Sequence, residues 1–119
     1  DVGTLQRLPR IIGDGMLREL AYTGRQFGAE EARGIGLVNR VYADHASLLA
    51  GVLEIAQEIA AKSPIAIAGT KAMISYMRDH TVNDGLEYVA TWNSAMLQSN
   101  DLRVAIAAHM SKQKPEFVD

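Results

Sequence analysis

Apolar side chains recur every three or four residues along most of the chain, in short segments that glycine or proline brings to an end. This spacing places apolar side chains on one face of a helix, so it predicts a string of amphipathic helices. Gly13 and Gly24 end the first two segments, and Pro64 cannot continue a longer helix that begins near Ala46. Ser63 before this proline is typical of a helix cap, with the proline in the first turn.

Two further helix N-termini are predicted from capping residues. Thr81 and Asp84 form a pattern close to a capping box, which predicts a helix through Met96, and Ser99 or Asn100 begins the last helix. Only residues 37–42 alternate in a strand-like way, and we expect one short strand there. Helices with a single strand leave apolar faces uncovered, so we expect a packing partner: a missing N-terminal half, a second subunit or both.

Composition excludes several classes of protein. The chain has 119 residues, of which 48% are hydrophobic and 22% charged, as in folded globular domains. A net charge of -2 without any basic block argues against nucleic-acid binding. No apolar stretch is long enough to span a membrane, and the absence of cysteine fits a reducing compartment.

Residues that commonly bind metals or redox cofactors are not grouped. His45, His80 and His109 are far apart in sequence and have no cysteine companions, so we expect no metal site. The Gly34 to Asn39 segment lacks the third glycine of a dinucleotide fingerprint and precedes the expected strand instead of following one. We therefore expect no bound cofactor.

The most informative motif is DVGTLQRLPRIIG at residues 1–13, a glycine turn that leads into a helix. It resembles the active-site loop and following helix of the crotonase (enoyl-CoA hydratase/isomerase) superfamily. The resemblance continues in register through LAYTGR at 20–25, AEEA at 29–32, GLVNRV at 36–41, AKSPIA at 61–66 and a final segment at 112–117.

The resemblance implies the C-terminal half of an α/β crotonase-like spiral fold, mainly α-helical as given. We expect residues 1–63 to be the end of the crotonase core and residues 64–119 to be a helical trimerisation region. The parent would be a homotrimer or a hexamer, and residues upstream of Asp1 are expected.

Asp1 separates two activities within the superfamily. Hydratases usually have glycine at this position, whereas dienoyl-CoA isomerases have aspartate, so residues 1–8 are most similar to the isomerases. The tail differs, because Lys112 to Phe117 is closer to the ending of the hydratases. Isomerisation of 3,5-dienoyl-CoA to 2,4-dienoyl-CoA removes a proton at C2 and delivers one at C6, which requires two ionisable groups.

The resemblance also implies roles for particular residues. Asp1 is the candidate catalytic acid at the distal end of the diene, its partner being a glutamate eight residues upstream. The N–H groups that hold the thioester oxygen also precede this chain. Lys112 is a weaker candidate for binding the phosphates of coenzyme A, the alternative being a solvated lysine at a helix end. Coenzyme A belongs to the substrate, and no separate cofactor is implied.

Three alternatives remain open at this point. The parent is a β-oxidation isomerase, an enoyl-CoA hydratase, or the source of a non-catalytic helical fragment that serves for assembly. Met73, Met77, Tyr76, Trp92 and Met96 are expected in the core more than in an acyl pocket. We expect the isolated chain to be inactive, and the parent to be cytoplasmic in a bacterium or mitochondrial or peroxisomal in a eukaryote.

Overall fold

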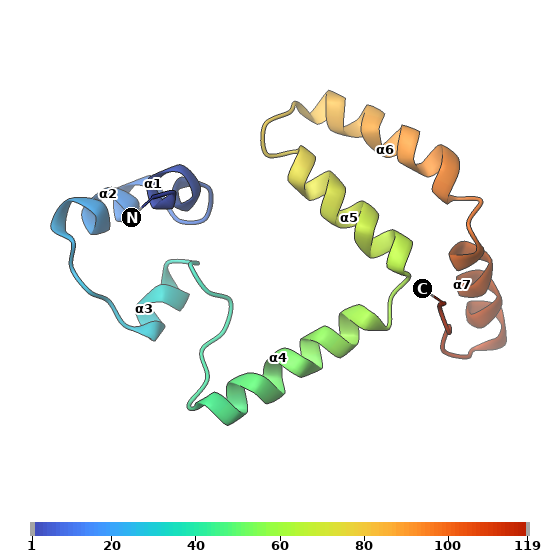
Figure 1. Cartoon of the computed structure of the whole chain (residues 1–119), viewed down its shortest axis with the longest axis horizontal. Helices are drawn as coiled ribbons and strands as arrows, with labels where there is room; N and C mark the ends of the chain where they lie inside the picture. The colour runs from blue at the N-terminus through green and yellow to red at the C-terminus, as the bar shows by residue number, and fades with distance from the viewer. Residues whose placement is uncertain (1, 119) are drawn as a thin grey trace. The chain divides into compact units, whose positions relative to one another are not determined.

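The structure is a computed structural model that describes residues 2–118. The chain divides into two compact units at Ala50 and Gly51, and each is described by itself. Figure 1 shows the elements in order along the chain. They are α1 (Thr4–Arg7), the 3-10 helix η1 (Leu8–Arg10), α2 (Asp14–Thr23), α3 (Ala29–Gly34), α4 (His45–Ala60), α5 (Pro64–Tyr76), α6 (Val82–Met96) and α7 (Asn100–Ser111).

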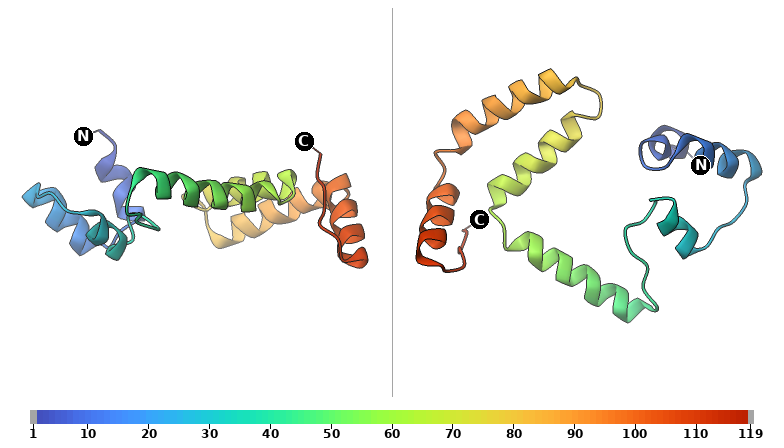
Figure 2. Two further views of the ribbon diagram at one scale, coloured as in Figure 1. Left: turned by 90° about the horizontal axis from the view of Figure 1, so that it is seen from below. Right: turned by 180° about the vertical axis from the view of Figure 1, so that it is seen from behind.

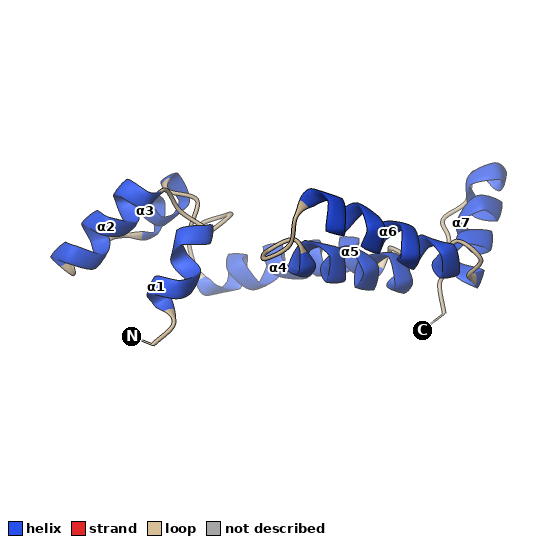
Figure 3. Cartoon of the chain, turned by 90° about the horizontal axis from the view of Figure 1, so that it is seen from above, coloured by secondary structure: helices blue, strands red, loops and turns tan. Residues whose placement is uncertain are grey.

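The strand expected near residues 37–42 is wrong for this chain. Residues 2–118 contain helices, turns and loops but no strand, as the colouring of Figure 3 shows. A strand requires a neighbour with which it exchanges backbone hydrogen bonds, and the described chain offers no second extended segment to residues 37–42. The alternating pattern therefore lies in irregular backbone.

A small apolar cluster forms the centre of the first unit. The side chains of Ile12, Leu17 and Leu20 are buried together, because their spacing places them on one side of α2 and on the turn before it. Partly buried side chains from the neighbouring elements complete the cluster: Leu8, Met16, Ile35 and Leu37. Helix α2 ends where expected, with Gly24 in a left-handed conformation at φ 62° and its N–H donating to the carbonyl of Leu20.

The end of α3 turns the chain back toward this cluster. The N–H groups of Leu37 and Val38 donate to the carbonyl of Ala32 at 2.9 and 3.3 Å. Gly36 between them and the helix has φ 80°, a conformation that glycine adopts without steric cost. The tight ending of α3 is what brings Leu37 against α2.

Helices α5 and α6 form an antiparallel hairpin in the second unit, side by side in Figures 1 and 2. Two glycines allow the close approach. A side chain on Gly69 would lie 2.7 Å from the indole nitrogen of Trp92, and one on Gly85 would collide with the sulfur of Met77. Met77 and Trp92 are therefore packing residues of the hairpin, as expected from the sequence.

The N-termini of the second unit carry the predicted caps. Ser63 accepts a hydrogen bond from the N–H of Ala66, and Thr81 and Asp84 form a reciprocal capping box at the start of α6. Asp101 in the first turn of α7 is buried, and its carboxylate accepts a hydrogen bond from the Ser63 hydroxyl. One carboxylate thus joins the first turns of α5 and α7.

Helix α4 contributes no buried residue although it has 16 residues. Its large apolar side chains are about half exposed, including Leu49 at 48% and Leu53 at 59%. The predicted need for a packing partner is consistent with these uncovered side chains.

Candidate functional site

The motif at the start of the chain forms a turn followed by a short helix. Gly3 precedes α1 with φ 103°, a backbone conformation that side-chain-bearing residues rarely adopt. The N–H of Arg7 donates to the carbonyl of Gly3 at 3.2 Å and closes the first helical turn. Asp1, the predicted catalytic acid, lies outside the described residues.

The Arg7 side chain folds back over this turn. A β-carbon placed on Gly3 would lie 3.6 Å from the Cζ of Arg7 and 3.8 Å from its Nε and Nη1. A β-carbon at this position would therefore touch the guanidinium at ordinary van der Waals distance. The Arg7 guanidinium thus lies beside the Gly3 turn.

An open hollow of about 860 Å³ lies in the first unit beside this turn. Its walls are mainly apolar, and the apolar side chains that line it are those of Val2, Leu5, Leu8, Ile11, Leu17, Leu20, Ala21, Phe27 and Leu37. Thr4, Arg7, Tyr22 and Arg25 contribute the polar parts of the lining. An apolar hollow with a few polar groups is the usual form of a small-molecule site.

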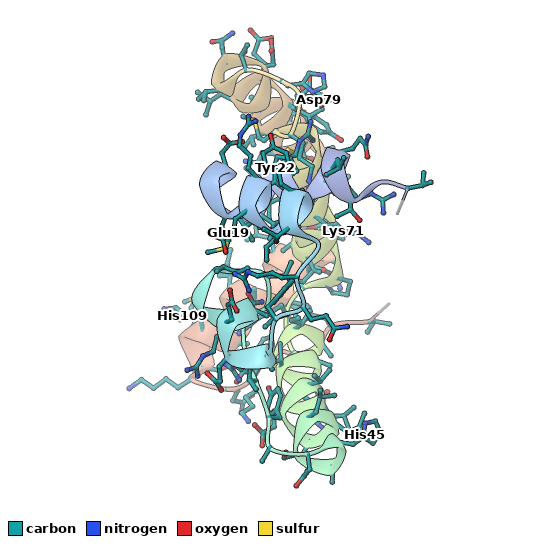
Figure 4. The ribbon with its side chains drawn as sticks, turned by 90° about the vertical axis from the view of Figure 1, so that its left-hand side faces the viewer. Glu19, Tyr22, His45, Lys71, Asp79 and His109 are labelled. Atoms are coloured by element: carbon teal, nitrogen blue, oxygen red, sulfur yellow. The ribbon has the colours of Figure 1, made fainter. Side chains whose placement is uncertain are left out.

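Arg25 closes one side of the hollow through a network of ion pairs. Its Nη2 donates to Glu31 at 2.5 Å and to Glu19 at 2.8 Å, while Nη1 reaches the second oxygen of Glu31 at 3.1 Å. Glu19 comes from α2 and is labelled in Figure 4. The network therefore ties α2 to α3 across the loop that contains Gly24 and Phe27.

This network changes the proton affinities of Glu31 and Arg25. The hydrogen bonds that Arg25 donates lower the pKa of Glu31, because they stabilise its charged form. The same bonds, from Glu31 first and Glu19 second, raise the pKa of Arg25. Arg25 was not predicted as a site residue, because its two glutamate partners lie six residues away on neighbouring helices and form no local motif with it.

Lys112, the second predicted site residue, ends α7 in the other unit. Its backbone is left-handed at φ 55°, and the N–H of Gln113 donates to the carbonyl of Ala108 at 2.9 Å, as in common helix endings. The Lys112 side chain is exposed. Its role in coenzyme A binding stays a prediction.

A second, smaller hollow of about 390 Å³ lies on the α5–α6 hairpin. Met73 and Trp92 line it, together with Gly69 and Val89. Tyr76 lies elsewhere, with its ring stacked on that of His80 at 3.6 Å between centroids.

The histidines come from separate elements, and Figure 4 labels His45 and His109, on α4 and α7. Within residues 2–118, no three histidine, aspartate or glutamate side chains are grouped as metal ligands would be. No helix in this part of the chain is long and apolar enough to cross a membrane.

Comparison with known proteins finds relatives along the whole chain. A family profile described as enoyl-CoA hydratase/isomerase matches residues 1–119. The chain is 51% identical over 117 residues to a peroxisomal Δ(3,5)-Δ(2,4)-dienoyl-CoA isomerase of Arabidopsis thaliana, covering 98% of this chain and 42% of that protein. It is 50% identical over 109 residues to the mitochondrial enzyme of the same name from Homo sapiens, covering 91% of this chain and 33% of that protein.

The fold is also similar to solved structures. An enoyl-CoA hydratase from Bacillus anthracis matches with a TM-score of 0.90 and 35% identity, over 97% of this chain and 44% of that one. The chain thus spans less than half the length of each of these relatives.

Proposed function

Because the chain belongs to the enoyl-CoA hydratase/isomerase family, we propose that its parent protein is a dienoyl-CoA isomerase of β-oxidation, which shifts 3,5-dienoyl-CoA to 2,4-dienoyl-CoA. The observation that carries the proposal is that half of the residues are shared with dienoyl-CoA isomerases, over almost the whole chain. Asp1, where hydratases usually have glycine, supports the same activity.

We place the chain in the C-terminal half of the parent's crotonase-like fold. The likeness of its ending, Lys112 to Phe117, to the ending of the hydratases supports this placement. Residues 1–63 would then complete the catalytic core, and residues 64–119 would form the helical region that assembles a trimer or a hexamer. The exposed apolar side chains of α4, such as Leu53, are consistent with further contacts in the parent.

In the proposed reaction, the carboxylate of the upstream glutamate takes a proton from C2. The electron pair of that C–H bond enters an enolate that is conjugated with both C=C bonds of the substrate, and backbone N–H groups upstream of this chain hold its oxygen. Asp1 then gives the proton of its carboxyl group to C6, forming the new C–H bond. Substrate and product have the same atoms, and proton exchange with water restores the two acids.

The residues that follow this acid in the sequence contribute to the hollow of the first unit. Val2 and Gly3 belong to the lining of the hollow and follow Asp1 directly. The apolar wall that begins there, with Leu5 and Leu8, suits the hydrocarbon part of an acyl chain. Lys112 is the candidate for the phosphates of coenzyme A, and the proposed reaction requires no other cofactor.

The test uses the full-length parent and a 3,5-dienoyl-CoA, with the absorbance of the conjugated 2,4-diene as the readout. Growth of this absorbance is expected. Asp1→Asn removes the proton donor and should reduce kcat by about two orders of magnitude or more, whereas Asp14→Asn, on the exposed start of α2, should leave it unchanged. Absence of the diene signal with folded parent protein would contradict the proposal.

Enoyl-CoA hydration is the second candidate, favoured by the hydratase-like tail at residues 112–117. Rapid water addition to crotonyl-CoA that survives Asp1→Asn would support it over isomerisation. A third reading, a non-catalytic fragment that serves for assembly, applies to the chain alone. We expect the isolated chain to be inactive, and a monomeric mass in solution would argue against the assembly role.

In this proposal, the cellular compartment of the parent depends on the kind of organism that produces it. Relatives of known name are peroxisomal in a plant and mitochondrial in human, which favours one of these organelles for a eukaryotic parent. A bacterial parent would be cytoplasmic.

A further inference from the structure

Met77 lies directly after α5, where a short loop joins this helix to α6 (Figure 1). Its sulfur lies against Gly85, which is buried near the start of α6. A β-carbon built on Gly85 would collide with this sulfur, whereas the Cγ and Cε of Met77 would both lie 3.5 Å from it. The sulfur is therefore the atom of Met77 that fills the space over the glycine.

The backbone on both sides of this contact is held by helical hydrogen bonds. The N–H of Met77 donates to the carbonyl of Met73 at 3.0 Å, and the N–H of Gly85 donates to the carbonyl of Thr81 at 3.1 Å. Neither backbone can move away without disturbing such a bond, so the contact offers little room for an additional atom. The packing of the sulfur on Gly85 thus holds the loop against α6.

Met77 differs from the other methionines in combining this contact with access to solvent. The chain contains five methionines, of which Met77 and Met110 are exposed, at 38% and 79%. Met16, Met73 and Met96 are of intermediate burial. Met110 is the more accessible thioether, whereas Met77 is accessible and also packs two parts of the hairpin together.

An accessible thioether reacts with hydroperoxides to form a sulfoxide. A lone pair of the sulfur attacks one oxygen of the peroxide, so that an S–O bond forms and the O–O bond breaks. The sulfur loses two electrons, and with hydrogen peroxide the other oxygen leaves with both hydrogens as water. The product carries an extra polar oxygen, which would lose its hydration if it were packed against the buried glycine.

We propose that Met77 is a sulfoxidation site, at which a hydroperoxide releases the α5–α6 loop from its contact with α6. Opening of the loop exposes the sulfur, and the sulfoxide does not fit back against Gly85, so oxidation favours the open arrangement. Methionine sulfoxide reductases reverse the change. This modification is independent of the proposed isomerase activity.

The test exposes the full-length parent to hydrogen peroxide for increasing times. Peptide mass spectrometry gives the oxidised fraction of each methionine, and the melting temperature is measured at a fixed protein concentration. The melting temperature should fall by about 2 to 8 °C in proportion to the oxidised fraction of Met77, and methionine sulfoxide reductases should restore it. Met77→Leu, a swap of similar volume, should remove this fall, whereas the matched control Met110→Leu should retain it.

Hydrogen exchange locates the change in the unaltered protein and decides the question if Met77→Leu does not fold. The N–H of Gly85 should exchange several-fold faster once Met77 is oxidised, because the loop and the first turn of α6 open more often. The N–H of Gly24, which donates to the carbonyl of Leu20 at 3.0 Å in the first unit, should exchange at an unchanged rate.

Three results would overturn the proposal. The first is a Met77 that stays reduced while Met110 is fully oxidised. The second is a Met77 sulfoxide that leaves the melting temperature and the exchange at Gly85 unchanged, and the third is a fall in melting temperature that persists in Met77→Leu. None of them depends on the formation of a 2,4-diene, so they are distinct from failure of the proposed function.

Discussion

The carboxylate of Asp101 accepts a hydrogen bond from the hydroxyl of Ser63, with 2.5 Å between the two oxygen atoms. This bond joins two helix N-termini that are 38 residues apart in sequence. Ser63 caps α5, and Asp101 lies in the first turn of α7. The Ile65 N–H, at 3.5 Å, points to the same carboxylate oxygen. A buried negative charge at two helix N-termini is favourable, because both present unpaired N–H groups.

Asp101→Ala should lower the free energy of unfolding of the parent by about 1–3 kcal/mol, because it leaves a partly buried hydroxyl without its acceptor. Urea unfolding provides the measurement. Combining Asp101→Ala with Ser63→Ala in a double-mutant cycle should give a coupling energy of at least about 0.5 kcal/mol. Additive effects of the two substitutions would show that the contact contributes nothing.

Gly69→Ala should destabilise the α5–α6 hairpin by about 1–3 kcal/mol, because the added methyl would lie within 2.9 Å of two atoms of the Trp92 indole. Trp92 is the single tryptophan of this chain. Its fluorescence reports the displacement once the signal of any tryptophan in the rest of the parent has been subtracted. Gly15→Ala is the matched control. Its new methyl meets nothing within 4 Å, and it should be neutral or slightly stabilising.

Glu31→Gln should reduce the sensitivity of the fold to acid. Arg25 lowers the pKa of Glu31 in the folded chain below its value in the unfolded chain. The resulting stabilisation is present above the unfolded pKa and is lost as the pH falls through the folded pKa. Melting temperatures between about pH 6 and pH 3 should therefore fall less steeply in Glu31→Gln. Glu30→Gln, at the exposed pair with Arg33, should leave the slope unchanged.

His80 should affect stability in the opposite pH direction. The carbonyl of Tyr76, followed by the carboxylate of Asp79, raises the pKa of His80 in the folded chain. This contribution is fully present below the unfolded pKa, near 6.5, and is lost as the pH rises through the folded pKa. The decrease in melting temperature caused by His80→Gln should be larger at pH 6 than at pH 9. An equal loss at both, or the same pattern in His109→Gln, would contradict this assignment.

Lys112→Asn tests the coenzyme A role without disturbing the end of α7. Asparagine tolerates the left-handed backbone of this position, so stability should be retained. If Lys112 binds a phosphate, KM for the acyl-CoA should rise by roughly three- to ten-fold with little change in kcat, as expected for loss of uniform binding. Lys114→Asn is the control, and an unchanged KM would leave Lys112 as a solvated helix-end lysine.

Local chemistry made much of the fold predictable. Pro64 stops one helix and begins the next, Thr81 and Asp84 cap α6, and Gly24 takes the left-handed ending of α2. Each of these features depends on residues within four positions of one another. Patterns of this length can be recognised in a sequence directly.

Features that depend on distant partners were not predictable in the same way. The strand expected at residues 37–42 is absent, because alternation alone does not provide a pairing neighbour. The hydrogen bond from Ser63 to Asp101 joins residues far apart in sequence, and so does the packing of Trp92 beside Gly69. For the candidate site, the resemblance of residues 1–8 selected Asp1, which lies outside the described residues, whereas the ion pairs of Arg25 with Glu19 and Glu31 emerged only in three dimensions.

Helix α4, with 16 residues and none of them buried, has an energetic consequence for whatever covers it. An isolated helix of this length is only marginally stable in water, so its backbone order and the burial of Leu49 and Leu53 are gained together. The free energy needed to order α4 then weakens the binding of the surface that covers it, as in coupled folding and binding. Substitutions on α4 that raise helix propensity without touching its apolar face should therefore tighten that association.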